Sequence, residues 1–267
     1  MRMKAMNVRW KRTGTLALIT AACWTPASTA LTIVGGSNYL TSRAPIVVDL
    51  TPFGNPGGLT HIELEGIPAG PGDSDTIIRR LHDASLSLPG DTDVVDVELV
   101  GLSLQSVNPV SVGGEYYQVM VTLNPIMPTL GQMEITLDDA TLPAGTFTAF
   151  FDLFVELALV EPSSHAVIQR LAGLPALHVE GSGYWTSRAP DGALTIIGAP
   201  GSPTANTHDP LSSGLFDFYI EDFVFDDGTN EASLTYAKNS VVPEPGTATL
   251  LCLGALGMGI KRRWHQG

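Results

Sequence analysis

Carboxylates in short turns are the side chains of this sequence that are most able to bind a ligand ion. Two closely spaced pairs stand out, Asp91 with Asp93 and Asp226 with Asp227. Carboxylate oxygens suit Ca²⁺, so calcium is the one metal that the sequence suggests. Aspartate is also common in turns because its side chain hydrogen-bonds to nearby backbone. We therefore name these four residues as calcium candidates and otherwise expect no cofactor.

A second polar group consists of His61, Glu63 and Glu65, which alternate with apolar residues. On a strand, all three would lie on one face. Two carboxylates across a cleft can hydrolyse a glycosidic bond, but neighbours on one strand are simply a polar surface. The sequence has no nucleophile elbow, no zinc-binding His-Glu-x-x-His, no phosphate loop and no EF-hand loop. We predict no catalytic residues and no enzyme activity; a carbohydrate-active enzyme with an unrecognised carboxylate pair is the alternative.

Aromatic and arginine side chains recur in an internal repeat. Residues 36–45 match residues 181–190 at eight of ten positions, and the similarity ends there. The repeat has two interpretations: the arginines tie down turns, or the copies form paired ligand sites with stacking faces and forked donors. Under the second interpretation, Trp185 is the best candidate for a ligand contact. The full set of candidate contacts is Tyr39, Arg43, Tyr184, Trp185 and Arg188.

The elements that must position these residues are strands. Through residues 31–241, short runs of β-branched and aromatic residues alternate with Gly, Pro, Asn and Asp, a pattern typical of strands joined by turns. We expect an all-β fold, an antiparallel β-sandwich built as one body or as two sandwich halves. The apolar run 147–157 predicts a central strand covered on both faces, and 75–82 and 164–171 predict helical turns.

The N-terminal residues 1–30 have the order of a secretory signal peptide. Five basic residues precede an apolar stretch from Leu16 to Trp24, and small residues end at Ala30. Cleavage after Ala30 would export the body, which makes signal peptidase and the secretion machinery expected partners. Lipoprotein processing at Cys23 is the rival interpretation, although Thr20 stands where such a site prefers Leu.

The C-terminal residues 242–267 combine three features. An extended Pro-Glu-Pro segment is followed by an apolar run at 247–260 and then by a basic cluster. At about 1.5 Å per residue, the apolar run reaches about 21 Å as a helix, which is short for a bilayer core of about 30 Å. Basic residues after such a helix keep its end in the cytoplasm. The residues concerned are Val242, Pro243, Glu244, Pro245 and Gly246, and then Lys261, Arg262 and Arg263.

This trio resembles the PEP-CTERM sorting tail of exported bacterial proteins. The resemblance implies that 247–260 is a transient transmembrane helix in the inner membrane. It also implies that an exosortase, a membrane protease, cuts near the Pro-Glu-Pro segment and passes the body to the cell surface or the extracellular space. The expected fold thus has a signal helix on one side of the body and a transmembrane helix on the other.

The composition of the body narrows its function. Residues 31–241 hold six basic against 26 acidic residues, a formal charge of −20, and neither cysteine. Such a charge disfavours nucleic acid as a partner. The resemblance of the tail implies a surface or extracellular-matrix protein that associates with exopolysaccharide. Ice binding is a further alternative, but it requires arrays of Thr-x-Thr, and Thr146 with Thr148 is the one clear instance in the body.

Overall fold

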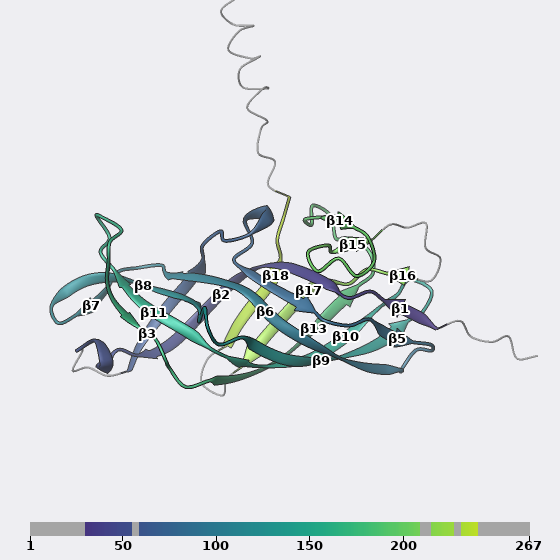
Figure 1. Cartoon of the computed structure of the whole chain (residues 1–267), viewed down its shortest axis with the longest axis horizontal. Coiled ribbons are helices and arrows are strands. Elements are labelled where there is room, and N and C mark those ends of the chain that lie inside the picture. The colour runs from purple at the N-terminus through teal and green to yellow at the C-terminus, as the bar shows by residue number, and fades with distance from the viewer. Residues whose placement is uncertain (1–29, 55–58, 209–214, 227–230, 240–267) are drawn as a thin grey trace, which may run out of the picture.

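The computed structural model describes residues 30–54, 59–208, 215–226 and 231–239, without the side chains of 43–49, 59, 226 and 231 (Figure 1). Strands dominate this part of the chain, and its only helical segments are two short 3-10 turns, η1 (Thr51–Phe53) and η2 (Pro71–Asp73). The strands are β1 (Leu31–Ile33), β2 (Gly36–Asp49), β3 (Leu59–Gly66), β4 (Thr76–Arg80), β5 (Ala84–Leu86), β6 (Thr92–Ser106), β7 (Val110–Val112), β8 (Glu115–Leu123), β9 (Thr129–Asp139), β10 (Ala144–Leu153), β11 (Val155–Val160), β12 (Val167–Leu171), β13 (Leu177–Thr186), β14 (Ile197–Gly198), β15 (Thr207–His208), β16 (Leu215–Phe216), β17 (Tyr219–Asp226) and β18 (Glu231–Tyr236).

Eight strands close into a barrel. Going round it, the order is β6, β4, β2, β18, β17, β13, β10 and β9, and every neighbouring pair is antiparallel. The pairing of β6 with β9 closes the ring, from Thr92 opposite Thr136 to Leu99 opposite Thr129. The all-β class is therefore confirmed. The expected sandwich of separate sheets is not, because this long-range pairing joins the sheet edges.

The two longest strands, β2 and β6, extend beyond the barrel. There they pair with a further set of strands, β3, β8, β11 and β12, which we call the second layer. The later half of β2 pairs with β3, and the end of β6 pairs with β3 and β8. β8 then carries β11, which carries β12. These strands form the left half of the elongated molecule in Figure 1, and the barrel forms the right half. A separate apolar core fills the second layer, with Leu50, Ile62 and Val119 among its most buried members.

The barrel interior is filled by alternate residues of its strands. On β10, Phe147, Ala149 and Phe151 point inward, because side chains alternate across a strand. The rings of Phe147 and Phe223 meet edge to face with centroids 4.9 Å apart. Burying each such ring contributes about 2–3 kcal/mol to the stability of the fold.

Three local predictions are wrong. Residues 76–80 form β4 rather than a helical turn, since Ile78 and Arg80 are buried while Ile77 and Arg79 are half-buried, an alternation of period two. Likewise, residues 167–171 form β12. The run 147–157 is not one strand covered on both faces. It divides at Phe154 into β10, which belongs to the barrel and has an exposed outer face, and β11, which belongs to the second layer.

No helix in the described ranges is long and apolar enough to cross a membrane. Residues 1–29 of the predicted signal peptide 1–30 and the whole predicted tail 242–267 lie outside those ranges. Their helices therefore stay predictions.

Candidate functional site: a groove on the outer face of the barrel

The outer face of the barrel carries rows of polar side chains that run across β9, β10 and β13. Inward positions on these strands are filled by the core, so the alternate positions face outward. The strand register then sets which outward residues are neighbours. One row consists of Glu134, Thr148 and Ser182, and the next consists of Gln132, Phe150 and Glu180.

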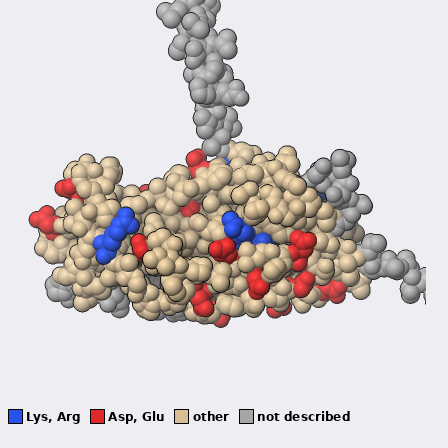
Figure 2. Space-filling model, viewed as in Figure 1, with Lys and Arg blue, Asp and Glu red and all other residues tan. Residues whose placement is uncertain are grey.

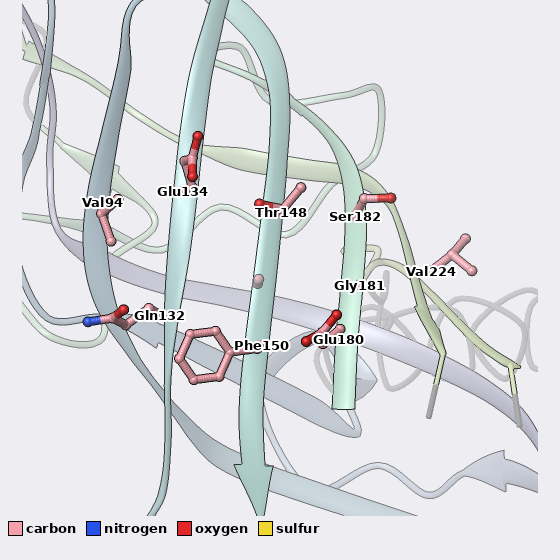
Figure 3. Close-up of a pocket in the computed structure, with 10 residues that line it drawn as sticks. Val94, Gln132, Glu134, Thr148, Phe150, Glu180, Gly181, Ser182 and Val224 are labelled. Atoms are coloured by element: carbon pink, nitrogen blue, oxygen red, sulfur yellow. The ribbon is translucent and has the colours of Figure 1, made fainter. Parts of the chain in front are cut away.

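These two rows line a groove with a volume of about 660 Å³. Small side chains, Thr148 and Ser182, occupy its centre, and Val94 and Val224 border it from β6 and β17. Larger side chains stand around them, as Figure 3 shows for Glu134, Gln132, Phe150 and Glu180. The hollow thus results from short side chains between long ones on a single sheet face.

Phe150 supplies the one aromatic ring among the groove-lining residues. It occupies an outward position of β10 and is only partly buried. Figure 3 shows the ring between Gln132 and Glu180. A partly exposed phenylalanine on a strand surface exposes apolar area to water that a ligand with an apolar face could cover.

His178 forms one rim of the groove. Its Nδ1 lies 2.9 Å from a carboxylate oxygen of Asp152, and its Nε2 lies 3.2 Å from one of Glu180. The imidazole also lies against Phe150, with ring centroids 5.5 Å apart. Hydrogen bonds to Asp152 and then to Glu180 raise the pKa of His178 above its usual value of 6.5.

Asp96 forms the opposite rim. One carboxylate oxygen lies 3.1 Å from Nε2 of His82, and the other accepts a hydrogen bond of 3.2 Å from the amide of Gln132. The hydrogen bond with His82, then that with Gln132, lowers the pKa of Asp96. Because its amide nitrogen donates to Asp96, the Gln132 side chain is held in place and its carbonyl oxygen remains to accept a hydrogen bond from a ligand.

The residues predicted to contact a ligand do not form one site. Trp185 is 1% exposed, inside the barrel, which contradicts the expectation of an exposed ring there. Tyr39 is 6% exposed, and its hydroxyl donates to the Thr204 carbonyl at 2.7 Å. Tyr184 and Arg188 are exposed, and Tyr184 follows the groove on the same sheet face. The Arg43 side chain lies outside the described residues.

The repeat has a structural explanation at its first glycine. A Cβ on Gly36 would lie 2.5 Å from the Ala205 carbonyl oxygen, and one on Gly181 would lie 2.5 Å from that of Val224. In each copy, therefore, backbone of another segment lies too close for a Cβ, residues 203–205 beside Gly36 and the paired strand β17 beside Gly181, and only glycine fits. Gly183 similarly leaves room for the ring of Phe147.

The side chains of the calcium candidates inside the described ranges accept hydrogen bonds from backbone amides. Asp91 accepts hydrogen bonds of 2.9 Å from the amides of Ser87 and Leu88. Asp93 accepts a hydrogen bond of 2.7 Å from the amide of Ser85 and one of 2.9 Å from the amide of its neighbour Val94. The described part of the chain holds no group of three or more His, Cys, Asp or Glu side chains arranged to bind a metal ion. Asp227 and the Asp226 side chain lie outside it.

Sequence reasoning missed the groove. The signal was present as alternating polar residues at 132–134, 148–152 and 178–182. These segments come from three strands, and only the register of β9, β10 and β13 brings them together. The prediction that 147–157 is covered on both faces also hid the exposed side of Phe150.

Comparison with known proteins concerns the tail alone. The profile of the PEP-CTERM protein-sorting motif matches residues 241–263. No curated protein matches the chain, and no solved structure matches it.

Proposed function

We infer the function of the body from two premises, the PEP-CTERM sorting motif at residues 241–263 and the groove on the barrel. The motif indicates a secreted surface protein that an exosortase sorts. We propose that residues 247–260 hold the body at the inner membrane only until the exosortase cuts near Pro243-Glu244-Pro245. The body then passes to the cell surface or the extracellular matrix.

The body, we propose, binds extracellular polysaccharide in the groove without altering it. The observation that carries this proposal is the position of Phe150 between Gln132 and Glu180 in a hollow of about 660 Å³. A sugar ring has an apolar face of C–H groups and an edge of hydroxyls. An aromatic ring flanked by amide and carboxylate acceptors matches both, and such a mixed lining is usual for small-ligand sites. The hydroxyls of Thr148 and Ser182 add weaker partners.

Binding fits the geometry better than hydrolysis does. Glu134 and Glu180 are the two carboxylates of the groove, and they stand on β9 and β13 with β10 between them. They are also two positions apart along the strands, so their Cα atoms are about 12 Å apart by strand spacing. Glycosidase carboxyl groups face each other across the scissile bond, whereas these two side chains project from one sheet face in the same direction. Two outward side chains on this face do not converge on one bond as a catalytic pair must.

Affinity electrophoresis tests the proposal. The body, residues 31–241, is run in native gels cast with polysaccharide extracted from the producing cells, beside gels without it. We expect the polysaccharide to retard the body. Phe150→Leu should weaken binding by about three- to tenfold, because it removes the stacking face but keeps an apolar side chain.

Tyr116→Leu is the matched control. Tyr116 is 67% exposed on β8, in the second layer, so this variant loses an exposed aromatic ring away from the groove. Equal retardation of the parent and Phe150→Leu would overturn the assignment of the groove. Release of reducing ends from the polysaccharide, abolished by Glu134→Gln or Glu180→Gln, would replace binding by hydrolysis.

A further inference from the structure

The groove carries negative charge without a basic partner. Glu134 and Glu180 line it, Asp96 and Asp152 stand on its rims, and no lysine or arginine is among its lining residues. Figure 2 shows the same trend over the visible face, where acidic side chains far outnumber basic ones. Arg79 lies on β4, next to β6, and is paired with Glu98 at 3.6 Å.

The two carboxylates of the groove differ in how they are engaged. Glu180 shares its charge with His178 at 3.2 Å. Glu134 makes no hydrogen bond or ion pair within the described part of the chain, and Figure 3 shows its side chain beside Thr148 at the centre of the hollow. Glu134 is therefore a carboxylate without a partner in the described part of the chain. It lies diagonally from Phe150, because Phe150 is opposite Gln132, two residues before Glu134 on β9.

This charge pattern decides which sugars the groove accepts. A chain of uronic acids or sulfated sugars would bring anions within a few ångströms of Glu134 and Glu180, where like charges repel and salt screens little. A protonated amine would instead form a charge-assisted hydrogen bond with Glu134, which is about twice as strong as one between neutral groups.

We propose that the groove recognises a polysaccharide of amino sugars with free amines, with one sugar ring on Phe150 and its amine, or that of the next residue, on Glu134. This inference rests on the proposed function of the groove and adds the chemical class of the ligand. Gln132 fits this assignment, since its amide nitrogen donates to Asp96 and its carbonyl oxygen is left as an acceptor for an amine or hydroxyl.

Isothermal titration with oligosaccharides of equal length tests the proposal. The probes are a glucosamine hexamer with free amines, the same hexamer fully N-acetylated, cellohexaose and a galacturonate hexamer, in slightly acidic buffer of low salt. We expect the free-amine hexamer to bind about tenfold or more tightly than the acetylated one, and the galacturonate hexamer to bind weakest.

Two variants test whether the preference for the free amine comes from Glu134. Glu134→Gln keeps the shape of the side chain and should remove most of the preference for the free amine, leaving binding of the acetylated hexamer unchanged. Glu115→Gln makes the same charge change at an exposed position on β8, in the second layer, and should leave the preference intact. Both side chains are exposed, so the melting temperature of each variant should match that of the parent.

Three outcomes would overturn the inference. If the acetylated hexamer or cellohexaose binds as tightly as the amine and still depends on Phe150, the groove binds polysaccharide but does not recognise amines. If Glu115→Gln weakens amine binding as much as Glu134→Gln, the attraction belongs to the net charge of the body. If none of the four hexamers binds, and the extracted polysaccharide is not bound either, both this inference and the proposed function are wrong.

Discussion

Trp185 stacks on Phe218 inside the barrel, with ring centroids 5.1 Å and planes 14° apart. Its indole N–H donates to the Thr136 carbonyl at 3.0 Å, so one side chain from β13 joins the core to the backbone of β9. We expect Trp185→Ala to lower the free energy of unfolding by about 3–5 kcal/mol, because it leaves a cavity and an unpaired acceptor. Urea denaturation followed by circular dichroism measures this loss.

The adjacent residue is the matched control. Tyr184 is 60% exposed on the outer face of the same strand. Tyr184→Ala should change the free energy of unfolding by no more than about 0.5 kcal/mol. If both variants were as stable as the parent, the inward position of Trp185 would be wrong.

Arg80 has the role that the repeat arginines were expected to have. It is 3% exposed, donates to Asn38 Oδ1, and donates to the Val34 carbonyl at 3.0 Å. Its guanidinium lies 4.5 Å from the centroid of the Phe218 ring. Burial lowers the pKa of Arg80 to about 10, opposed by Asp217 and Asp83, so it stays charged at neutral pH.

We expect Arg80→Lys to lower the free energy of unfolding by about 2 kcal/mol. Lysine keeps the charge, but it lacks the fork that reaches both acceptors, and one of them is left buried and unpaired. Thermal and urea denaturation measure the loss. Arg188→Lys, at an exposed position in the second repeat copy, should stay within about 0.5 kcal/mol. An Arg80→Lys protein as stable as Arg188→Lys would contradict this account.

His178 should titrate above its usual pKa of 6.5. Hydrogen bonds to Asp152 and Glu180 favour its protonated form in the folded state. A raised pKa stabilises the fold below the unfolded value, and this contribution is lost as the pH rises through the folded pKa. Since the imidazole is largely exposed, we expect the effect on melting to be small and the titration itself to be the useful readout.

NMR titration of the His178 ring protons measures that pKa. Asp152→Asn should shift it downward, because Asp152 is the larger of the two causes. Glu115→Asn, on the second layer, should leave it unchanged. A midpoint for the parent at or below that of Asp152→Asn would show that the contact with Asp152 does not form.

Processing of the tail gives a fourth prediction. In cells with an exosortase, surface-extracted protein should lack the residues after the Pro-Glu-Pro segment, because two prolines disfavour regular structure that would shield the segment from a protease and the apolar run is short for a lasting anchor. Intact-mass analysis should find the tail in cells without the exosortase and not in cells with it. Retention of residues 261–267 in most molecules from exosortase-positive cells would contradict the proposal.

Local pattern was enough to predict the all-β class and several strands. Residues 60–65, where His61 to Glu65 alternate between exposed and buried, form β3 as expected. The sorting tail was also recognisable from its sequence, because its order of Pro-Glu-Pro, apolar run and basic cluster needs no tertiary context.

The predictions that failed depend on contacts between segments that lie far apart in the sequence. Closure of the barrel depends on the pairing of β6 with β9, and nothing in the local sequence of either strand indicates its partner. The burial of Trp185 follows from strand alternation only once it is known that Tyr184 faces outward. Tyr39 breaks even this rule, because residues 203–205 cross over β2 and cover its outer side, where the Tyr39 hydroxyl meets Thr204. The groove needed three strands in register before its side chains became neighbours.

Barrel closure also bears on how the body folds during export. β2 and β18 meet near the two ends of the described chain, where Thr41 and Thr235 face each other across 194 residues. The ring therefore cannot form until almost the whole body has crossed the membrane, and pairings of such long sequence separation form slowly. Slow closure would leave the chain time to be exported before the barrel forms. Once closed, the ring leaves no open strand edge among its eight strands for a neighbouring molecule to extend, which removes from the barrel a common starting point for aggregation.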